Sequence, residues 1–567
     1  MTRPMSELPA GNGRLEAAFS AIIALLIFLL SYARIYYGIS FTDEAYFIAI
    51  PWRFIHGDSP FQTELATLFG MFSFISYPFF KIFYLLRGSA EGIVLYARHL
   101  YFVFELLVAA GVFYFSRTFV RTPEALLVAS CVIAFVPFNV QGLSYNTLAC
   151  GFLTLGLFAG AQGVLANSIL RLALSGWLLT YGAIVYLPLV PVAFLAFVLL
   201  VRTDRRAFLP FFVGTLLALC SLTPFLSYAT WDAIRNNLDY TLSIGVQGGG
   251  WRKPLRVIWD TLHYLWPSIL GSGFLVFLIQ RKGDNLLRLI ALLLLPIVLV
   301  VVNGMSAKPG SATYAYVGHG YVLGLALIGV WLYPFLNAEH KKLFMLVWVP
   351  SGLAAAIMGY SSSNGYINVG IGLLAGGICS LILLIALLTQ KGEHQLVFPR
   401  WIGVAVPSLA ACALVLYQYS SVYCDSALPR LTTEVASGPF KYIRTTPEKA
   451  AFIEDVAYWV RRVSAQSRSI IFYYDFPAGY LMTDMKPATN AIWLFQPSNY
   501  RNINTSMLSQ YISATPPDII FKFRHVFQVD KYDNQFNDDG YPIDVLANSG
   551  GYTIISDNVN FVIYQRN

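Results

Sequence analysis

The sequence predicts a polytopic α-helical membrane protein with a small α/β domain at its C-terminal end. Of its 567 residues, 57% are hydrophobic and only 12% are charged, and the mean hydropathy is +0.59. A soluble domain has about 25% charged residues, so a chain this poor in charge cannot cover its surface in water. Long apolar runs recur from Leu15 to Tyr419, and the mixed polar pattern of a soluble domain begins only near Ser420.

Thirteen apolar segments are candidates for membrane-spanning helices, because about 20 apolar residues cross a bilayer as a helix. They lie near 16–37, 94–116, 123–140, 146–166, 170–185, 186–202, 207–228, 257–280, 285–303, 314–336, 341–360, 367–390 and 399–419. The stretch Leu68–Leu86 is also apolar, but Gly70 and Pro78 interrupt it. It is therefore predicted to be an interfacial or re-entrant helix and not a span.

Basic residues in the short loops predict the orientation. They fall in alternate connections, at Arg117 and Arg121, Arg171, Arg202 to Arg206, Arg281 to Arg288, His340 to Lys342, and Lys391. By the positive-inside rule these loops and the N-terminus are cytoplasmic. The same distribution explains the net charge of +8, which forms no basic stripe, so nucleic-acid binding is not predicted. The compact loops favour a bacterial inner membrane.

The chain divides into two predicted domains at about Ser420. Residues 1–419 form the transmembrane domain, whose first external loop, 38–93, contains juxtamembrane helices. Thirteen spans from a cytoplasmic N-terminus place this loop and residues 420–567 on the same, extracytoplasmic side. The first long loop and the C-terminal domain are therefore predicted to share a compartment.

The C-terminal domain shows local signals of an α/β fold. A helix is predicted at Pro447–Ala465, with Thr445 or Thr446 as its cap and Glu448 in its first turn. Short apolar runs rich in Ile, Phe and Tyr then predict strands. These strands are Ser469–Tyr474, Asp518–Phe523, Tyr552–Ile555 and Phe561–Tyr564.

Two adjacent carboxylates, Asp43 and Glu44, directly follow the first apolar segment. At a membrane boundary an unpaired charge is costly because it loses its hydration. One explanation is that the pair caps a short juxtamembrane helix, since Thr-Asp-Glu suits a first helical turn. The other is a site in the long loop that they open, because long loops without a domain of their own are usually functional.

No cofactor is predicted from the cysteines or from metal-ligand spacing. Five of the six cysteines lie in apolar segments, and no CxxC pair occurs. Asp43 and Glu44 with His56 could form part of a metal site, but no complete ligand set is visible. Metal dependence is left open.

The start of the first external loop resembles the GT-C superfamily of membrane glycosyltransferases. The residues that carry this resemblance are Phe41-Thr42-Asp43-Glu44-Ala45-Tyr46, which come directly after the first apolar helix. Many further helices and a C-terminal external domain complete it, so it covers the architecture of the whole chain. The superfamily includes protein mannosyltransferases and the aminoarabinose transferase that modifies lipid A. The tail stretch Asp475–Tyr480 looks like bacterial members of this group.

The resemblance implies transfer of a sugar from a polyprenyl-phosphate carrier, with inversion, to an acceptor hydroxyl outside the cytoplasm. Asp43 matches the position of the general base of the family, which takes the proton of the acceptor hydroxyl as the new bond forms. Glu44 would orient this base or replace it, and two carboxylates so close should titrate as a coupled pair. The acceptor class, whether glycan, lipid or protein, is not implied.

Polar residues near the predicted outer surface are candidates for binding the substrate or the carrier phosphate. Cations there would stabilise the phosphate as it leaves. The candidates are Lys308, Arg98, Arg252, Lys253, His56, Tyr145 and Asn146. For the cations the alternatives are interfacial anchors or a plain linker, and for Tyr145 and Asn146 the alternative is helix capping.

Two other functions stay open: a transporter or flippase, and a polysaccharide polymerase or ligase that uses lipid-linked sugars. Transporters often show inverted repeats and ionisable residues within their spans. This chain shows no repeat and few such residues, among them Glu105 and His319. Polymerases and ligases tend to rely on basic and histidine residues in a late loop, whereas here the acids follow the first span.

Overall fold

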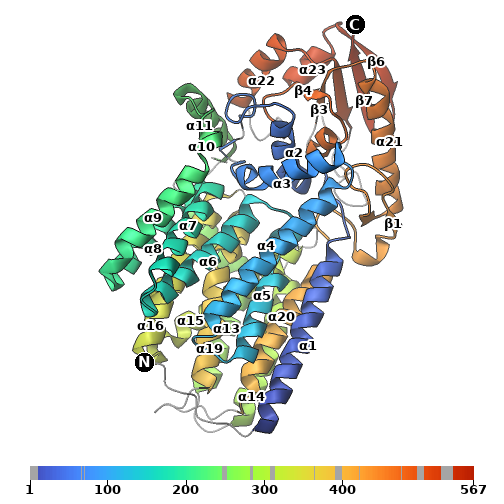
Figure 1. Ribbon diagram of the computed structural model, residues 1–567. Helices are drawn as coiled ribbons and strands as arrows, with labels where there is room; N and C mark the ends of the chain where they lie inside the picture. Colours follow the sequence, from blue (N-terminus) through green and yellow to red (C-terminus); the bar gives the residue numbers. More distant parts are fainter. Residues whose placement is uncertain are drawn as a thin grey trace.

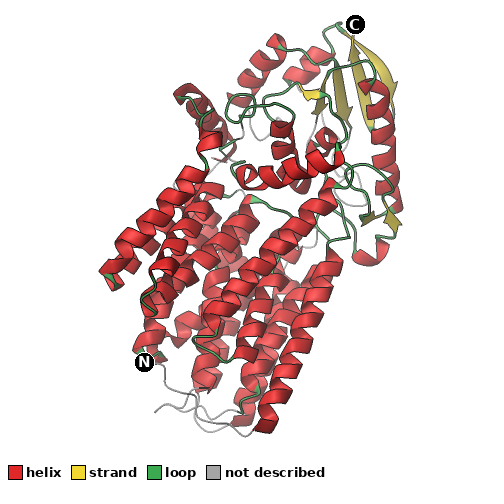
Figure 2. Cartoon of the chain, in the orientation of Figure 1, coloured by secondary structure: helices red, strands yellow, loops and turns green. Residues whose placement is uncertain are grey.

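The computed structural model describes residues 10–65, 67–68, 70–245, 252–280, 285–306, 313–362, 364–389, 399–420, 422–473, 476–494, 503–524 and 541–567. These residues form a long helical body, and a smaller part that contains the strands lies at one end of it (Figures 1 and 2). The C-terminus lies in this smaller part, as Figure 1 shows.

The helical body contains helices in all thirteen ranges predicted as spans. They are α1 (Ala10–Arg34), α4 (Ile93–Ser116), α5 (Thr122–Ala134), α6 (Tyr145–Leu165), α7 (Ile169–Val185), α8 (Val190–Thr203), α9 (Phe208–Ser221), α10 (Thr223–Leu226), α12 (Arg252–Tyr264), α13 (Trp266–Gln280), α14 (Asn285–Ser306), α15 (Thr313–Leu332), α16 (Ala338–Leu343), α17 (Val349–Ser361), α18 (Val369–Gly372), α19 (Leu374–Thr389) and α20 (Ile402–Ser420). Within the described residues, six helices are long and apolar enough to cross a membrane, or eight if two bent pairs each count as one span. This is the body of a multi-pass membrane protein, although the predicted count of thirteen spans is not confirmed.

Breaks in the helices explain part of this difference. The predicted span 257–280 consists of two helices, α12 and α13, that are bent by 63° at their junction. Pro267 is the second residue of α13, where its ring and missing N–H group prevent the preceding helix from continuing. The predicted span 367–390 is also bent, by 49°, between α18 and α19.

Two further helices lie between α1 and α4. Helix α2 (Asp43–Ile55) begins with the acidic pair, and α3 (Phe72–Arg87) falls within the stretch predicted as interfacial. One face of α3 buries Phe80 and Phe83, whereas Leu85 and Leu86 on another face are exposed. This amphipathic pattern agrees with a helix that lies along a membrane surface.

The C-terminal part contains a five-stranded sheet in the order β4-β3-β5-β7-β6. Its strands are β3 (Ser469–Tyr473), β4 (Lys486–Pro487), β5 (Ile519–Phe523), β6 (Tyr552–Asp557) and β7 (Phe561–Arg566). Strand β3 pairs in parallel with β4 and β5, and β7 pairs antiparallel with β5 and β6. The helices of this part are α21 (Pro447–Ser464), α22 (Ile503–Ala514) and α23 (Pro542–Ala547). The predicted α/β pattern is therefore confirmed.

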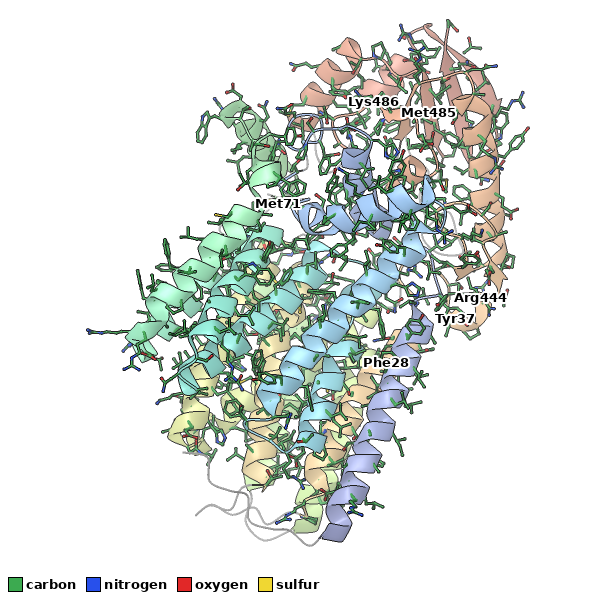
Figure 3. The ribbon with its side chains drawn as sticks, viewed as in Figure 1. Phe28, Tyr37, Met71, Arg444, Met485 and Lys486 are labelled. Carbon is green, nitrogen blue, oxygen red and sulfur yellow. The ribbon has the colours of Figure 1, made fainter. Side chains whose placement is uncertain are left out.

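A short backbone pairing joins the C-terminal part to the end of α1. Strands β1 (Thr433–Glu434) and β2 (Arg444–Thr445) form a small sheet. The N–H of Arg444 donates to the carbonyl of Tyr36, and the N–H of Gly38 donates to the carbonyl of Arg444, both at 2.8 Å. Figure 3 shows Tyr37 beside Arg444 at this junction. The segment that leads to the acidic pair is thus held directly against the C-terminal part.

Candidate active site

The acidic pair lies in the first turn of α2, a few residues beyond the end of α1. Gly38 has φ +82°, and a side chain there would collide with Val422, so the chain needs glycine to turn at this point. Thr42 precedes the helix, but its side chain makes no capping hydrogen bond. The carboxylates of Asp43 and Glu44 therefore lie where the partial positive charge of the helix N-terminus favours anions.

Asp43 is partly exposed, and a tyrosine hydroxyl holds it. The hydroxyl of Tyr423 donates to Oδ2 of Asp43 at 2.5 Å, and that of Thr42 approaches the same oxygen at 3.4 Å. Burial of Asp43 raises its pKa above the usual value, while the hydrogen bonds from Tyr423 and Thr42 act in the opposite direction. A raised pKa brings a carboxylate closer to the range in which a general base works well.

Glu44 has a different environment, although it is the next residue. It is buried and forms a two-pronged ion pair with Arg98, with N–O distances of 2.5 and 2.8 Å. Arg98 also donates to the carbonyls of Ile35 and Gly38, each at 2.6 Å. Glu44 therefore fastens α2 to α4 and to the end of α1, and Asp43 is the carboxylate that stays available.

Arg98 was a candidate for the carrier phosphate, and the structure places it beside the acidic pair. Its side chain is buried, and its guanidinium donors are directed at Glu44 and at backbone carbonyls. A buried arginine in such a site positions its partners. The geometry favours this role over contact with a substrate.

His56 lies at the other end of α2. Thirteen helical residues span about 20 Å, which separates it from Asp43 by that distance. Its Nδ1 is 2.9 Å from the carbonyl of Trp52, and its Nε2 is 3.7 Å from the exposed carboxylate of Asp484. Beside it, Arg53 is buried and paired with Asp58 and Glu64. The structure does not bring His56 to the acidic pair.

Tyr145 and Asn146 begin α6 on the same side of the helical body as Asp43. The ring of Tyr145 packs against Phe47 of α2 at 5.9 Å, and Tyr145 lies within electrostatic range of Asp43. Ser144 caps α6 by accepting from the N–H of Thr147, so capping does not explain the two residues after it. The side chain of Asn146 is buried, and no described residue donates a hydrogen bond to its Oδ1.

A line of contacts connects Tyr145 with the start of α12. Tyr145 stacks on Tyr186 at 5.7 Å, and the Tyr186 hydroxyl is 2.8 Å from Oγ of Ser361. The neighbouring Tyr360 ring lies 5.7 Å from Nζ of Lys253. Lys253 and the exposed Arg252 before it therefore belong to the same side of the helical body as Asp43. Lys308, Asp475 and residues 247–251 of the glycine-rich loop lie outside the described residues.

The C-terminal part contributes residues that the sequence did not predict for this site. Lys449 of α21 is buried, and its Nζ donates to the carbonyls of Ile39 and Cys424 at 2.6 and 2.5 Å. It also lies 3.7 Å from the carboxylate of Asp425, which accepts from the N–H of Ile39. Tyr423 belongs to the same short segment. These contacts hold the chain before Asp43 against the segment that follows α20.

Sequence signals for these residues are weak. Tyr423 lies 380 positions after Asp43 in the chain, and its only signal is its place just after the last apolar segment. Trp493 is a second example, because its ring packs on Tyr46 at 4.9 Å, one turn of α2 beyond Asp43. The sequence predicted one compartment for the first loop and the C-terminal domain, but it predicted no contact between them such as the structure has here.

The hydrogen bonds of His319, which lies inside the body, are consistent with core packing, whereas Glu105 lacks, among the described residues, the cation partner that would explain it in the same way. His319 is buried, with Nδ1 2.7 Å from the carbonyl of Ile367 and Nε2 3.3 Å from the N–H of Phe138. Glu105 is buried in α4, and no cation of the described chain pairs with it. Among the described residues there is no group of three His, Cys, Asp or Glu side chains that could hold a metal ion.

Comparison with known proteins gives matches among solved structures. ArnT from Cupriavidus metallidurans is similar to this chain with a TM-score of 0.42 and 12% identity, and the match covers 98% of each chain. The structure of ArnT bound to undecaprenyl phosphate is similar with a TM-score of 0.41. The oligosaccharyltransferase AglB from Archaeoglobus fulgidus, in complex with an inhibitory peptide and a dolichol-phosphate, is similar with a TM-score of 0.46, 13% identity, and 89% of this chain and 69% of AglB covered. ArnT and AglB are both GT-C glycosyltransferases. No family model and no curated protein matches the chain.

Proposed function

We propose that this protein is a membrane glycosyltransferase that moves a sugar from a polyprenyl-phosphate carrier to an acceptor hydroxyl, with Asp43 as the general base. The observation that carries the proposal is the difference between the two adjacent carboxylates. Glu44 is buried and neutralised by Arg98. Asp43 is partly exposed, and no cation in the described ranges pairs with it.

The chemistry needs one carboxylate that can accept a proton. Asp43 takes the proton of the acceptor hydroxyl. At the same time the acceptor oxygen attacks the anomeric carbon of the sugar. The bond from that carbon to the carrier phosphate breaks on the opposite face, so the configuration inverts. The polyprenyl phosphate leaves with the electron pair, and Asp43 then releases the proton to water. The base is thus regenerated without a covalent intermediate.

The surroundings of Asp43 fit this role. The Tyr423 hydroxyl fixes one oxygen of the carboxylate and leaves the other for the acceptor. Tyr145 and Asn146 at the start of α6 offer an aromatic face and a buried amide oxygen for sugar or acceptor hydroxyls. Because Arg98 is committed to Glu44, the carrier phosphate is assigned to Arg252, Lys253 or Lys308.

Asp43→Asn in membranes supplied with a labelled polyprenyl-phosphate sugar tests the proposal. We expect transfer to fall by about 10²–10⁴-fold, the usual contribution of a general base. Asp484→Asn is the matched control, since its carboxylate is exposed and lies at the far end of α2 beside His56. Unchanged transfer by the Asp43 variant would exclude this residue as the base. Flux into vesicles without an acceptor would instead support a transporter.

A further inference from the structure

An apolar groove opens at the end of the helical body opposite Asp43. Helix α6 starts beside Asp43 and α7 returns toward it, so the turn between them lies at the far end. The groove has a volume of about 440 Å³, and its lining includes Ile169 and Ala173 of α7 and Leu209 and Val213 of α9. This volume is within the range of small-molecule sites, about 300–1,000 Å³.

A close crossing of two helices explains why the groove forms. A Cβ atom on Gly176 of α7 would lie 2.1 Å from the carbonyl oxygen of Phe211, and one on Gly214 of α9 would lie 1.9 Å from that of Ala173. The two backbones are therefore in direct contact, as small residues allow within membranes. The groove lies beside this crossing, toward the turns, where Ile169 and Leu209 stay 70% and 65% exposed.

The rim of the groove is polar and basic. Arg206, Asn167 and Asp204 line it, and Asp204 accepts a hydrogen bond from the N–H of Arg206 in its own turn. The guanidinium of Arg206 is exposed, and no ion pair to it occurs in the described part of the chain. Arg205, the preceding residue, is a second exposed cation beside it. Charge complementarity thus favours an anionic headgroup above an apolar chain.

We propose that this groove binds one anionic phospholipid of the leaflet at that end of the protein. The phosphate lies on Arg206 with the Asn167 amide beside it, and an acyl chain lies along Ala173 and Val213. A polyprenyl phosphate has a similar headgroup, but its phosphate would lie at the opposite end from Asp43. Non-specific attraction of anionic lipid to the membrane surface would also explain these arginines. It would give Arg206 no larger effect on lipid binding than Arg202, which is outside the groove.

The test uses the full chain, freed of lipid in detergent and titrated with phosphatidylglycerol or phosphatidylcholine. Bound lipid is counted by native mass spectrometry. We expect one retained phosphatidylglycerol for each chain and weaker retention of phosphatidylcholine. Arg206→Gln should weaken phosphatidylglycerol binding by about tenfold, which corresponds to losing one charged hydrogen bond. Val213→Trp should remove binding by filling the groove, and Arg202→Gln should leave it unchanged.

Three results would overturn the proposal. Equal retention of the two lipids would remove the headgroup selectivity. An equal effect of Arg202→Gln and Arg206→Gln would indicate general surface attraction and no built site. Preferential retention of undecaprenyl phosphate over phosphatidylglycerol would make the groove a carrier site. Since Arg206 is exposed, Arg206→Gln tests the headgroup contact even if Val213→Trp fails to fold.

Discussion

Two arginines at each end of the helical body have opposite environments. At the end of the body that contains α2, Arg53 and Arg98 are buried and paired with carboxylates and backbone carbonyls. At the far end, Arg205 and Arg206 are exposed, and the described residues offer them no carboxylate partner. Arg53 and Arg98 therefore stabilise the fold, whereas Arg205 and Arg206 are free to bind ligands from outside.

This difference changes how the cations near the candidate base are interpreted. Removing one partner of a buried ion pair leaves an uncompensated charge, which costs far more than losing an exposed pair. Arg98 is thus needed to keep Glu44 and the turn after α1 in place. Proximity to the acidic pair does not make it a phosphate ligand, and the burial of its donors argues against that role.

The largest expected effect comes from breaking the buried pair. Arg98→Gln leaves the Glu44 carboxylate buried without its cation and removes bonds to Ile35 and Gly38. We expect the free energy of unfolding to fall by about 3–5 kcal/mol. Arg206→Gln, the matched change at the far end, should alter it by less than about 0.5 kcal/mol. Thermal unfolding in the same detergent measures both, and equal effects would contradict the comparison.

A second effect of similar kind concerns the junction with the C-terminal part. Lys449→Met leaves the carbonyls of Ile39 and Cys424 without their donor. Each buried unsatisfied group costs about 1–3 kcal/mol, so we expect a loss of about 2–4 kcal/mol. Limited proteolysis should then cleave between α20 and α21. Lys441→Met, which removes an exposed pair with Glu91, is the control and should leave cleavage unchanged.

The part of the fold that local signals determine was predictable. Helix α21 was predicted at Pro447–Ala465 and is found at Pro447–Ser464, because its cap, first proline and first-turn acid lie within three residues. The pairing of Glu44 with Arg98 was not predictable, because the partners are 54 positions apart and no periodicity links them. Apolar composition likewise predicted where helices lie, but not the bend between α12 and α13.

A smaller effect is expected from removing the hydrogen bond that Asp43, unlike Glu44, accepts from Tyr423. Tyr423→Phe removes the hydroxyl that donates to Asp43, and this hydrogen bond acts to lower the pKa of that carboxyl. The pKa of Asp43 should therefore rise, and the acid limb of the kcat/KM profile for sugar transfer should move to higher pH. We expect about tenfold lower transfer near the wild-type acid limb, the equivalent of one charged hydrogen bond.

The control for this change is another tyrosine at the end of α20. Tyr419 donates to the carbonyl of Leu30 at 2.6 Å, away from the acidic pair. Tyr419→Phe should leave the position of the acid limb unchanged, although both variants lose one hydroxyl. An infrared pH titration of the Asp43 carboxyl follows the same shift without an assay of transfer. A shift of equal size in both variants would mean that general loosening, and not the bond to Asp43, moves the pKa.

The smallest effect is on stability, and it decides whether Asp43 belongs to the scaffold. Burial raises the pKa of Asp43 in the folded protein. The stability that the protonated Asp43 carboxyl allows is therefore fully present below the pKa that Asp43 has in the unfolded chain. It is lost as the pH rises through the pKa that Asp43 has in the folded protein, because the buried carboxyl then ionises. At pH 7 the ionised carboxylate of Asp43 destabilises the folded protein. Asp43→Asn should therefore leave the free energy of unfolding unchanged or raise it by up to about 1 kcal/mol.

Asp43→Asn also has a pH signature. As the pH falls through the folded pKa of Asp43, the carboxyl becomes neutral and the wild-type protein should approach the stability of Asp43→Asn. Unfolding curves measured from pH 7 down to pH 4 would show this convergence. A loss of several kcal/mol at pH 7 would place Asp43 with Glu44 as an anchor of α2. The acid pair would then have no member free for chemistry, and the proposed base would have to be sought elsewhere.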